Sequence, residues 1–118
     1  MRISRVLILS SLLMGGVAFA DGLKNLQVLP KTMTKDEIKP LMRAQAKALG
    51  VECDFCHDVP DMASDKIAAK NVARQMMKMM AEINDKWLKG MKDADKNKIT
   101  CGTCHQGHEQ PPPFVPAK

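Results

Sequence analysis

The chain has 118 residues and a formal net charge of +5, and 45% of its residues are hydrophobic. This length suggests a single domain. Aromatic residues make up only 3% of the chain, and the basic residues are not concentrated in one stretch, so a nucleic-acid-binding surface is not expected.

Residues 1–20 have the pattern of a secretory signal peptide. Two arginines precede an apolar run, and an Ala-Phe-Ala tripeptide follows that ends at Ala20. This order matches the basic region, the apolar region and the cleavage site of an export signal. The alternative is an uncleaved membrane anchor, for which the apolar run is short. We therefore expect cleavage after Ala20, a periplasmic mature domain over residues 21–118, and no stable membrane insertion.

A first helix is predicted after a short extended lead-in. Thr34 and Glu37 have the spacing of a capping box, in which each residue caps a backbone N–H of the other. Apolar residues then recur at helical spacing as far as Leu49, and Gly50 suits the end of the helix. Pro40 either kinks this helix or marks a later start.

A second, longer helix is predicted to run to about Leu88, with Ser64 or Asp65 as its N-cap and Gly90 as its terminator. Met77 lies off its apolar stripe. The stripe consists of Ala69, Val72, Ala73, Met76, Met79, Met80, Ile83 and Trp87, which share one broad face of a 3.6-residue period. No strand-like alternation occurs, so the predicted fold class is all-α.

The segments outside these helices carry weaker signals. Residues 86–98 are a charged linker, and the D-x-D-x-N sequence that starts at Asp93 lacks the Gly and Glu of a calcium loop, so a solvated loop is expected. Residues 111–118 are rich in proline, which predicts an extended, polyproline-like tail.

All four cysteines fall in two C-x-x-C-H motifs. They are Cys53, Cys56 and His57 in the first motif, and Cys101, Cys104 and His105 in the second. This is the attachment signature of c-type haem, because two thiols three positions apart can each form a thioether to one porphyrin, and the adjacent His can bind its iron. We therefore predict two covalent haem c groups.

The cysteines allow three other interpretations. The two pairs could hold a structural zinc ion, or export could permit two disulfides, but neither explains a His after both pairs. A thioredoxin-like redox motif requires a βαβ context, which the sequence does not provide.

Methionine is the natural candidate for the sixth iron ligand. Apart from the two motifs the chain has one His, His108, which follows His105 too closely to reach the opposite face of the same haem. Each motif is preceded by an amphipathic helix that bears Met, and a thioether ligand raises the reduction potential relative to a second His. Periodicity alone does not choose among Met76, Met79 and Met80.

The sequence resembles the tetrahaem cytochrome subunit of photosynthetic reaction centres, and more closely one two-haem half of it. The resemblance covers nearly all of the expected mature chain. It is carried by Val28-Leu29-Pro30, Leu41-Met42, Ala73-Arg74-Gln75-Met76-Met77, Ile83-Asn84, Trp87, Ile99-Thr100-Cys101, Thr103-Cys104-His105 and Gly107.

The resemblance implies a small multihaem cytochrome built of two units, each a helix followed by its C-x-x-C-H motif. In that family the helix commonly supplies the distal Met, which implies Met42 for the first haem and Met76 for the second. The chain departs from the family near Gly90, where the family has a His that binds a further haem.

Together these features predict an electron carrier rather than an enzyme. It would pass single electrons between redox partner proteins, whose identity the sequence does not give. The alternatives are a two-haem, peroxidase-like enzyme and a haem-based sensor, which both need an iron position that can open.

Overall fold

The computed structural model describes residues 22–117. The expected signal peptide therefore lies outside the described residues. Within this part of the chain all regular elements are helical, which confirms the all-α fold class. They are α1 (Lys35–Leu49), η1 (Cys53–Phe55), α2 (Ala68–Glu82), η2 (Ile83–Trp87) and α3 (Cys101–His105).

Helix α1 begins and ends where the sequence predicts. The Glu37 N–H donates to the Thr34 hydroxyl over 3.3 Å, and the Thr34 N–H donates to the Glu37 carboxylate over 2.8 Å. The pKa of Glu37 is lowered by the hydrogen bond that its carboxylate accepts from the Thr34 N–H, followed by the one that it accepts from the Thr34 hydroxyl. Pro40 lies inside the helix, so it does not mark the start. Gly50 ends the helix with a φ of 68°, in the left-handed region that favours glycine.

The start of α2 differs from the prediction. Its N-cap is Ile67, which makes no side-chain cap, so the assignment of Ser64 or Asp65 as the N-cap is wrong. Both side chains are used elsewhere: the Ser64 hydroxyl accepts from the Lys66 N–H over 3.2 Å, and the Asp65 carboxylate binds side chains described below.

The end of α2 agrees with the prediction. The helix continues through the π-helical turn η2, in which the Leu88 N–H donates to the Ile83 carbonyl over 3.0 Å. The Asn84 side chain then joins this turn to the segment before α3. Its amide donates to the Ile99 carbonyl and its oxygen accepts from the Ile99 N–H, each over 2.9 Å. This pair fixes how the chain approaches the second C-x-x-C-H motif.

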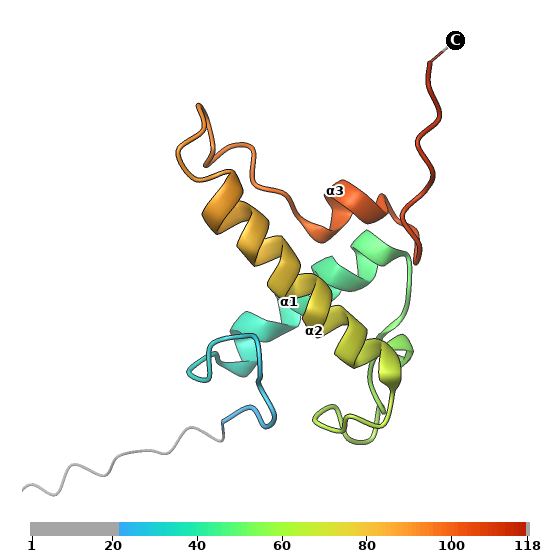
Figure 1. Ribbon diagram of the computed structural model, residues 1–118. Coiled ribbons are helices and arrows are strands. Elements are labelled where there is room, and N and C mark those ends of the chain that lie inside the picture. The colour runs from blue at the N-terminus through green and yellow to red at the C-terminus, as the bar shows by residue number, and fades with distance from the viewer. Residues whose placement is uncertain (1–21, 118) are drawn as a thin grey trace, which may run out of the picture.

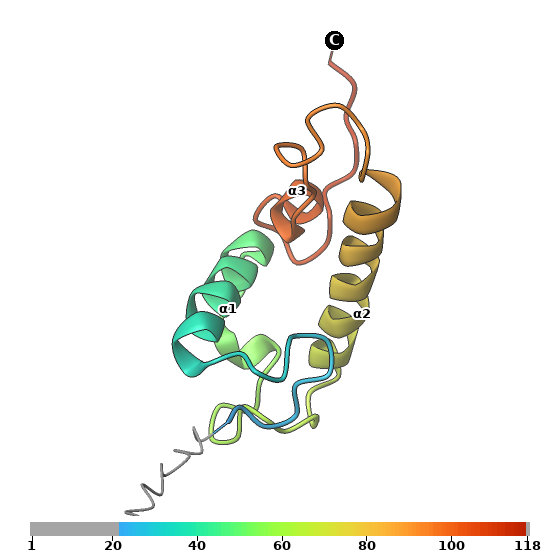
Figure 2. The same cartoon turned by 90° about the vertical axis from the view of Figure 1, so that its left-hand side faces the viewer.

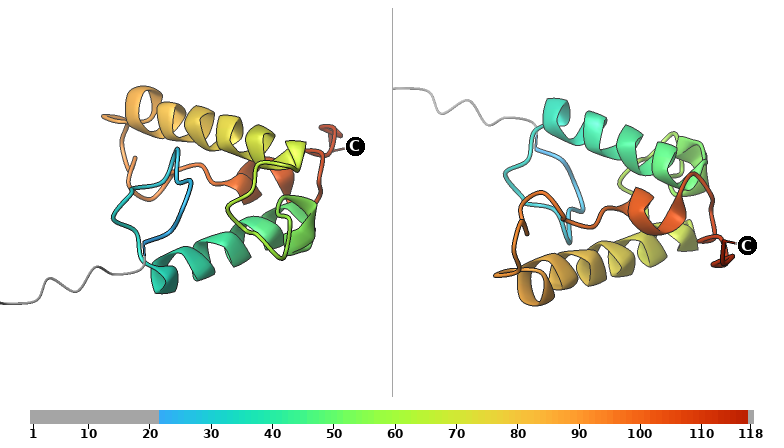
Figure 3. Two further views of the ribbon diagram at one scale, coloured as in Figure 1. Left: turned by 90° about the horizontal axis from the view of Figure 1, so that it is seen from below. Right: turned by 90° about the horizontal axis from the view of Figure 1, so that it is seen from above.

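Helices α1 and α2 form the two long sides of the molecule and cross at an angle, because they run the same way in Figure 2 and opposite ways in Figure 3. Helix α3 packs near the C-terminal end of α1 (Figure 1). The Gly107 N–H, in the turn after α3, donates to the Ala48 carbonyl of α1 over 2.8 Å. This contact brings the second motif close to the end of α1, which three residues separate from the first motif.

No hydrophobic side chain of residues 22–117 is fully buried. On α2 the large apolar side chains of Val72, Met76 and Met79 are each about half exposed, with 50%, 46% and 50% of their surface accessible. Met77 and Met80 are more sheltered. Met77, expected to lie off the stripe that contains Met76 and Met79, is on the sheltered side, so α2 presents one exposed and one sheltered apolar side.

Of the helices in residues 22–117, none combines the length and the apolar character that crossing a membrane requires.

Candidate functional site

Each C-x-x-C-H motif is wound into a helical turn. In the first, the His57 N–H donates to the Cys53 carbonyl over 3.0 Å, which closes the turn that begins with η1. The second motif is the whole of α3. Residues three positions apart lie on the same side of a helical turn, so in each motif the two cysteines can reach one flat ligand.

The His residues of the two motifs make the same kind of hydrogen bond. The His57 Nδ1 lies 3.0 Å from the Met62 carbonyl oxygen, and the His105 Nδ1 lies 3.0 Å from the His108 carbonyl oxygen. A carbonyl only accepts, so each Nδ1 must carry the proton. The lone pair is then on Nε2, which is the tautomer that a metal-ligating His requires.

The four cysteines are unbridged. Cys53 and Cys104 are exposed, and Cys56 and Cys101 are half-buried. Burial raises the pKa of the Cys56 thiol. Among residues 22–117 no three His, Cys, Asp or Glu side chains converge into a metal-binding group.

The methionines predicted as iron ligands lie on the two long helices. Met42 is half-buried in the middle of α1. Met76 lies on the exposed apolar side of α2 together with Met79, whereas Met80 is on the sheltered side. The structure thus separates Met80 from Met76 and Met79, which periodicity could not do. It does not distinguish Met76 from Met79.

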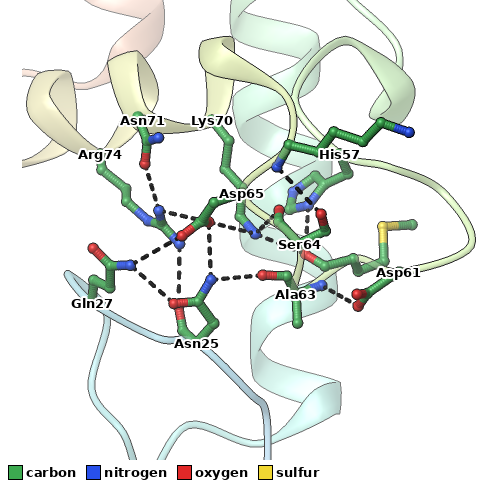
Figure 4. Close-up of polar contacts among 12 residues, drawn as sticks. Asn25, Gln27, His57, Asp61, Ala63, Ser64, Asp65, Lys70, Asn71 and Arg74 are labelled. Carbon is green, nitrogen blue, oxygen red and sulfur yellow. Dashed lines mark hydrogen bonds and ion pairs between the residues drawn. The ribbon is translucent and has the colours of Figure 1, made fainter.

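A polar cluster holds the loop that carries the Met62 carbonyl (Figure 4). Its centre is Asp65, whose Oδ1 lies 2.9 Å from the Asn25 amide nitrogen, 2.8 Å from Arg74 and 3.3 Å from Lys70. The hydrogen bond from Asn25, followed by the interactions with Arg74 and Lys70, lowers the pKa of Asp65. The cluster therefore ties the N-terminal lead-in and the first turns of α2 to this loop.

Sequence reasoning missed the groups that orient the two His rings. The acceptors are main-chain carbonyls of Met62 and His108, which leave no signal in residue type. Lys70 lies off the apolar stripe of the predicted helix, so the sequence gives no sign that this residue is buried.

The residues present fit two covalently bound haems. Each motif provides two unbridged thiols and a His with a free Nε2, and α2 has an exposed apolar side. A helical chain with two such motifs is a c-type cytochrome.

Comparison with known proteins agrees with this class. A sequence model of the family "Photosynthetic reaction centre cytochrome C subunit" matches residues 10–115. The chain belongs to this family, whose members are electron-transfer haem proteins.

Three relatives illustrate the similarity. Cytochrome c-554 of Chloroflexus aurantiacus is 34% identical over 58 residues, which cover 49% of this chain and 14% of the relative. The photosynthetic reaction centre cytochrome c subunit of Roseobacter denitrificans is 32% identical over 103 residues, or 82% of this chain and 28% of the relative. The subunit of the same name from Rubrivivax gelatinosus is 31% identical over 101 residues, or 70% and 28%. The chain thus spans under a third of the length of these relatives.

Proposed function

We propose that this protein is a periplasmic electron carrier that holds two covalent haem c groups and passes single electrons between redox partner proteins. The observation that carries the proposal is the matched geometry of the two motifs. Both His57 and His105 donate from Nδ1 to a main-chain carbonyl over 3.0 Å, which leaves Nε2 of each ring free as a ligand.

Eight residues would hold the two groups. Thioethers would form at Cys53, Cys56, Cys101 and Cys104, and the iron ligands would be His57 and Met42 for the first haem and His105 and Met76 for the second. When bound, haem supplies reversible one-electron chemistry at its iron.

The protein's own residues set the conditions for that chemistry. The Nδ1 hydrogen bonds fix the orientation of the His rings and raise their basicity. A Met sulfur is a neutral, soft ligand that favours the ferrous state. With a His and a Met on each iron, no position is open for a substrate, which suits a carrier rather than an enzyme. The exposed apolar side of α2, with Met76 and Met79, would shield the second group from water.

The proposal includes export and protein partners. Cleavage after Ala20 would release the domain over residues 21–118 into the periplasm, where bacterial c-type haem is attached. The relatives are named as subunits of reaction centres, which supports proteins as the electron donor and acceptor. Aromatic residues make up 3% of the chain, too few for a surface on which bases stack, so the proposal includes no nucleic-acid partner.

A potentiometric titration of the purified holoprotein, with spectra recorded throughout, tests this function. We expect two one-electron transitions and a ferric Met–iron charge-transfer band. Carbon monoxide added to the reduced protein should leave the spectrum unchanged, because Met occupies the position that it would need. Rapid stoichiometric binding of carbon monoxide to either haem would contradict the carrier function and favour an enzyme or a sensor.

A further inference from the structure

We propose that Lys70 raises the reduction potential of the haem at Cys53 and Cys56, by placing a positive charge on the carbonyl group that orients His57. Lys70 would thus be a positioning residue that acts through His57. This inference rests on the proposed function, in which His57 is an iron ligand.

The evidence is a carbonyl oxygen with two donors. The Lys70 Nζ lies 3.0 Å from the Met62 oxygen, and the His57 Nδ1 lies 3.0 Å from the same oxygen. Figure 4 shows both side chains pointing toward the loop between the first motif and α2. Lys70 extends from the first turn of α2, and His57 extends from the first motif.

Lys70 is held firmly in this place. It is the most buried residue of the described range 22–117, with 9% of its surface accessible. Its ammonium group has three donors and three acceptors, which are the Met62 oxygen, the Ser64 oxygen at 2.7 Å and the Asp65 Oδ1 at 3.3 Å. A buried cation with every donor satisfied has a fixed position, so its effect on the shared carbonyl is permanent.

Two effects of the charge act in the same direction. A carbonyl that already accepts from an ammonium group is a poorer acceptor for the His57 Nδ1–H, so the ring keeps less negative character and stabilises the ferric state less. The positive charge on Lys70 also disfavours the additional charge of ferric iron, and this interaction is weakly screened because the group is buried. Both effects raise the reduction potential.

Neighbouring charges reduce this effect, and Asp61, whose Oδ1 accepts from the Ala63 N–H on the same loop, is one of them. Asp65 faces Lys70 at 3.3 Å, but its Oδ1 is also 2.8 Å from Arg74, whose side chain is largely buried. The three groups together carry one net positive charge. On the loop side, Asp58 is paired with the exposed Lys66 at 3.7 Å, so this pair adds no net charge.

The second motif provides an internal comparison. Its His105 Nδ1 bonds to the His108 carbonyl over 3.0 Å, and within residues 22–117 no cationic side chain donates to that oxygen. Loss of the charge at position 70 should therefore affect one haem and spare the other.

The test is a potentiometric titration of the holoprotein with the variants Lys70→Met, Lys70→Arg and Lys66→Met. Lys70→Met should lower one midpoint potential so that the ferrous-to-ferric ratio at a fixed potential falls three- to tenfold, which is about 28–59 mV for one electron. Lys70→Arg keeps the charge and should keep the potential. Lys66→Met removes an exposed charge that does not contact Met62. For neither haem should it change the ferrous-to-ferric ratio at a fixed potential by as much as threefold.

Proton NMR of the reduced protein identifies the haem that changes. The Nδ1–H resonance of His57 should move downfield in Lys70→Met, because the bond to the Met62 oxygen strengthens, while that of His105 stays. If Lys70→Met does not mature, Lys70→Gln provides the same charge loss with a polar side chain.

The outcomes are distinguishable from those of the proposed function. A wild-type protein without two haem transitions would contradict the function itself. If the wild type has two haem transitions and Lys70→Met changes neither midpoint potential, or changes both equally, only the role of Lys70 is contradicted.

Discussion

The contact between Gly50 and Gly107 offers a sharp test of how the two motifs are brought together. Gly50 has a φ of 68°, and a Cβ atom there would lie 3.0 Å from the carbonyl carbon of Gly107 and closer still to its oxygen. Gly50→Ala should therefore incur about 1–2 kcal/mol for the left-handed backbone. Displacing Gly107 would also weaken its hydrogen bond to the Ala48 carbonyl, a further loss of about 1 kcal/mol.

Gly107→Ala is the matched control. Gly107 also has a positive φ, 85°, but an added Cβ would meet no atom within 4 Å, so only the backbone cost of about 1–2 kcal/mol applies. Guanidinium unfolding of both holoproteins, followed by far-UV circular dichroism, gives the two losses in free energy of unfolding. Gly50→Ala should be the larger by about 1 kcal/mol or more. Equal losses would show that the α1–α3 junction is not as tight as described.

The remaining predictions concern single side chains at four positions. His108→Ala should leave the haem spectra unchanged, because His105 uses the main-chain carbonyl of residue 108, which alanine retains. Met76→Ala should abolish the ferric Met–iron charge-transfer band of one haem and lower its potential. Met79→Ala should keep that band and lower the free energy of unfolding by about 1 kcal/mol, since half of this side chain is exposed. In Asp65→Asn, the free energy of unfolding should fall less steeply than in the wild type as the pH is lowered. The pKa of Asp65 is lowered in the folded state, so its contribution is present above the ordinary carboxyl pKa and disappears as the pH falls through the folded value.

Each of these has a result that would count against it. A spectral change in His108→Ala would mean that its ring reaches an iron. A band lost in Met79→Ala and kept in Met76→Ala would reverse the ligand assignment. For Asp65→Asn, the control is Asp95→Asn, whose side chain is fully exposed. If both variants have the same acid unfolding profile as the wild type, the Asp65 cluster contributes nothing to the pH dependence.

Local signals explain which parts of the fold could be predicted from sequence. The capping box of Thr34 and Glu37 and the glycine at position 50 act within α1 itself, and both ends of that helix were predicted correctly. The start of α2 was not, because Asp65 binds Asn25, which is 40 residues away in sequence. A residue with a distant partner does not need to cap the helix beside it, and the sequence does not reveal that choice.

The same distinction applies to the site. The C-x-x-C-H motifs are local sequence patterns, so their residues can be named from the sequence alone, and haem attachment at them stays a prediction. The groups that orient His57 and His105 are main-chain carbonyls placed by the fold of the following loops, so residue type could not identify them. Likewise, the exposed position of Met76 and Met79 and the sheltered position of Met80 depend on which side of α2 faces the rest of the chain.

The most direct test of the central claim is intact-mass spectrometry of the purified protein after acid–acetone extraction, which removes haem that is not covalently attached. The account predicts a mass that corresponds to the polypeptide plus two haems, and the loss of one haem when Cys101 and Cys104 are both replaced by alanine. A mass equal to the bare polypeptide, with the haem in the acetone phase or with zinc in its place, would contradict it.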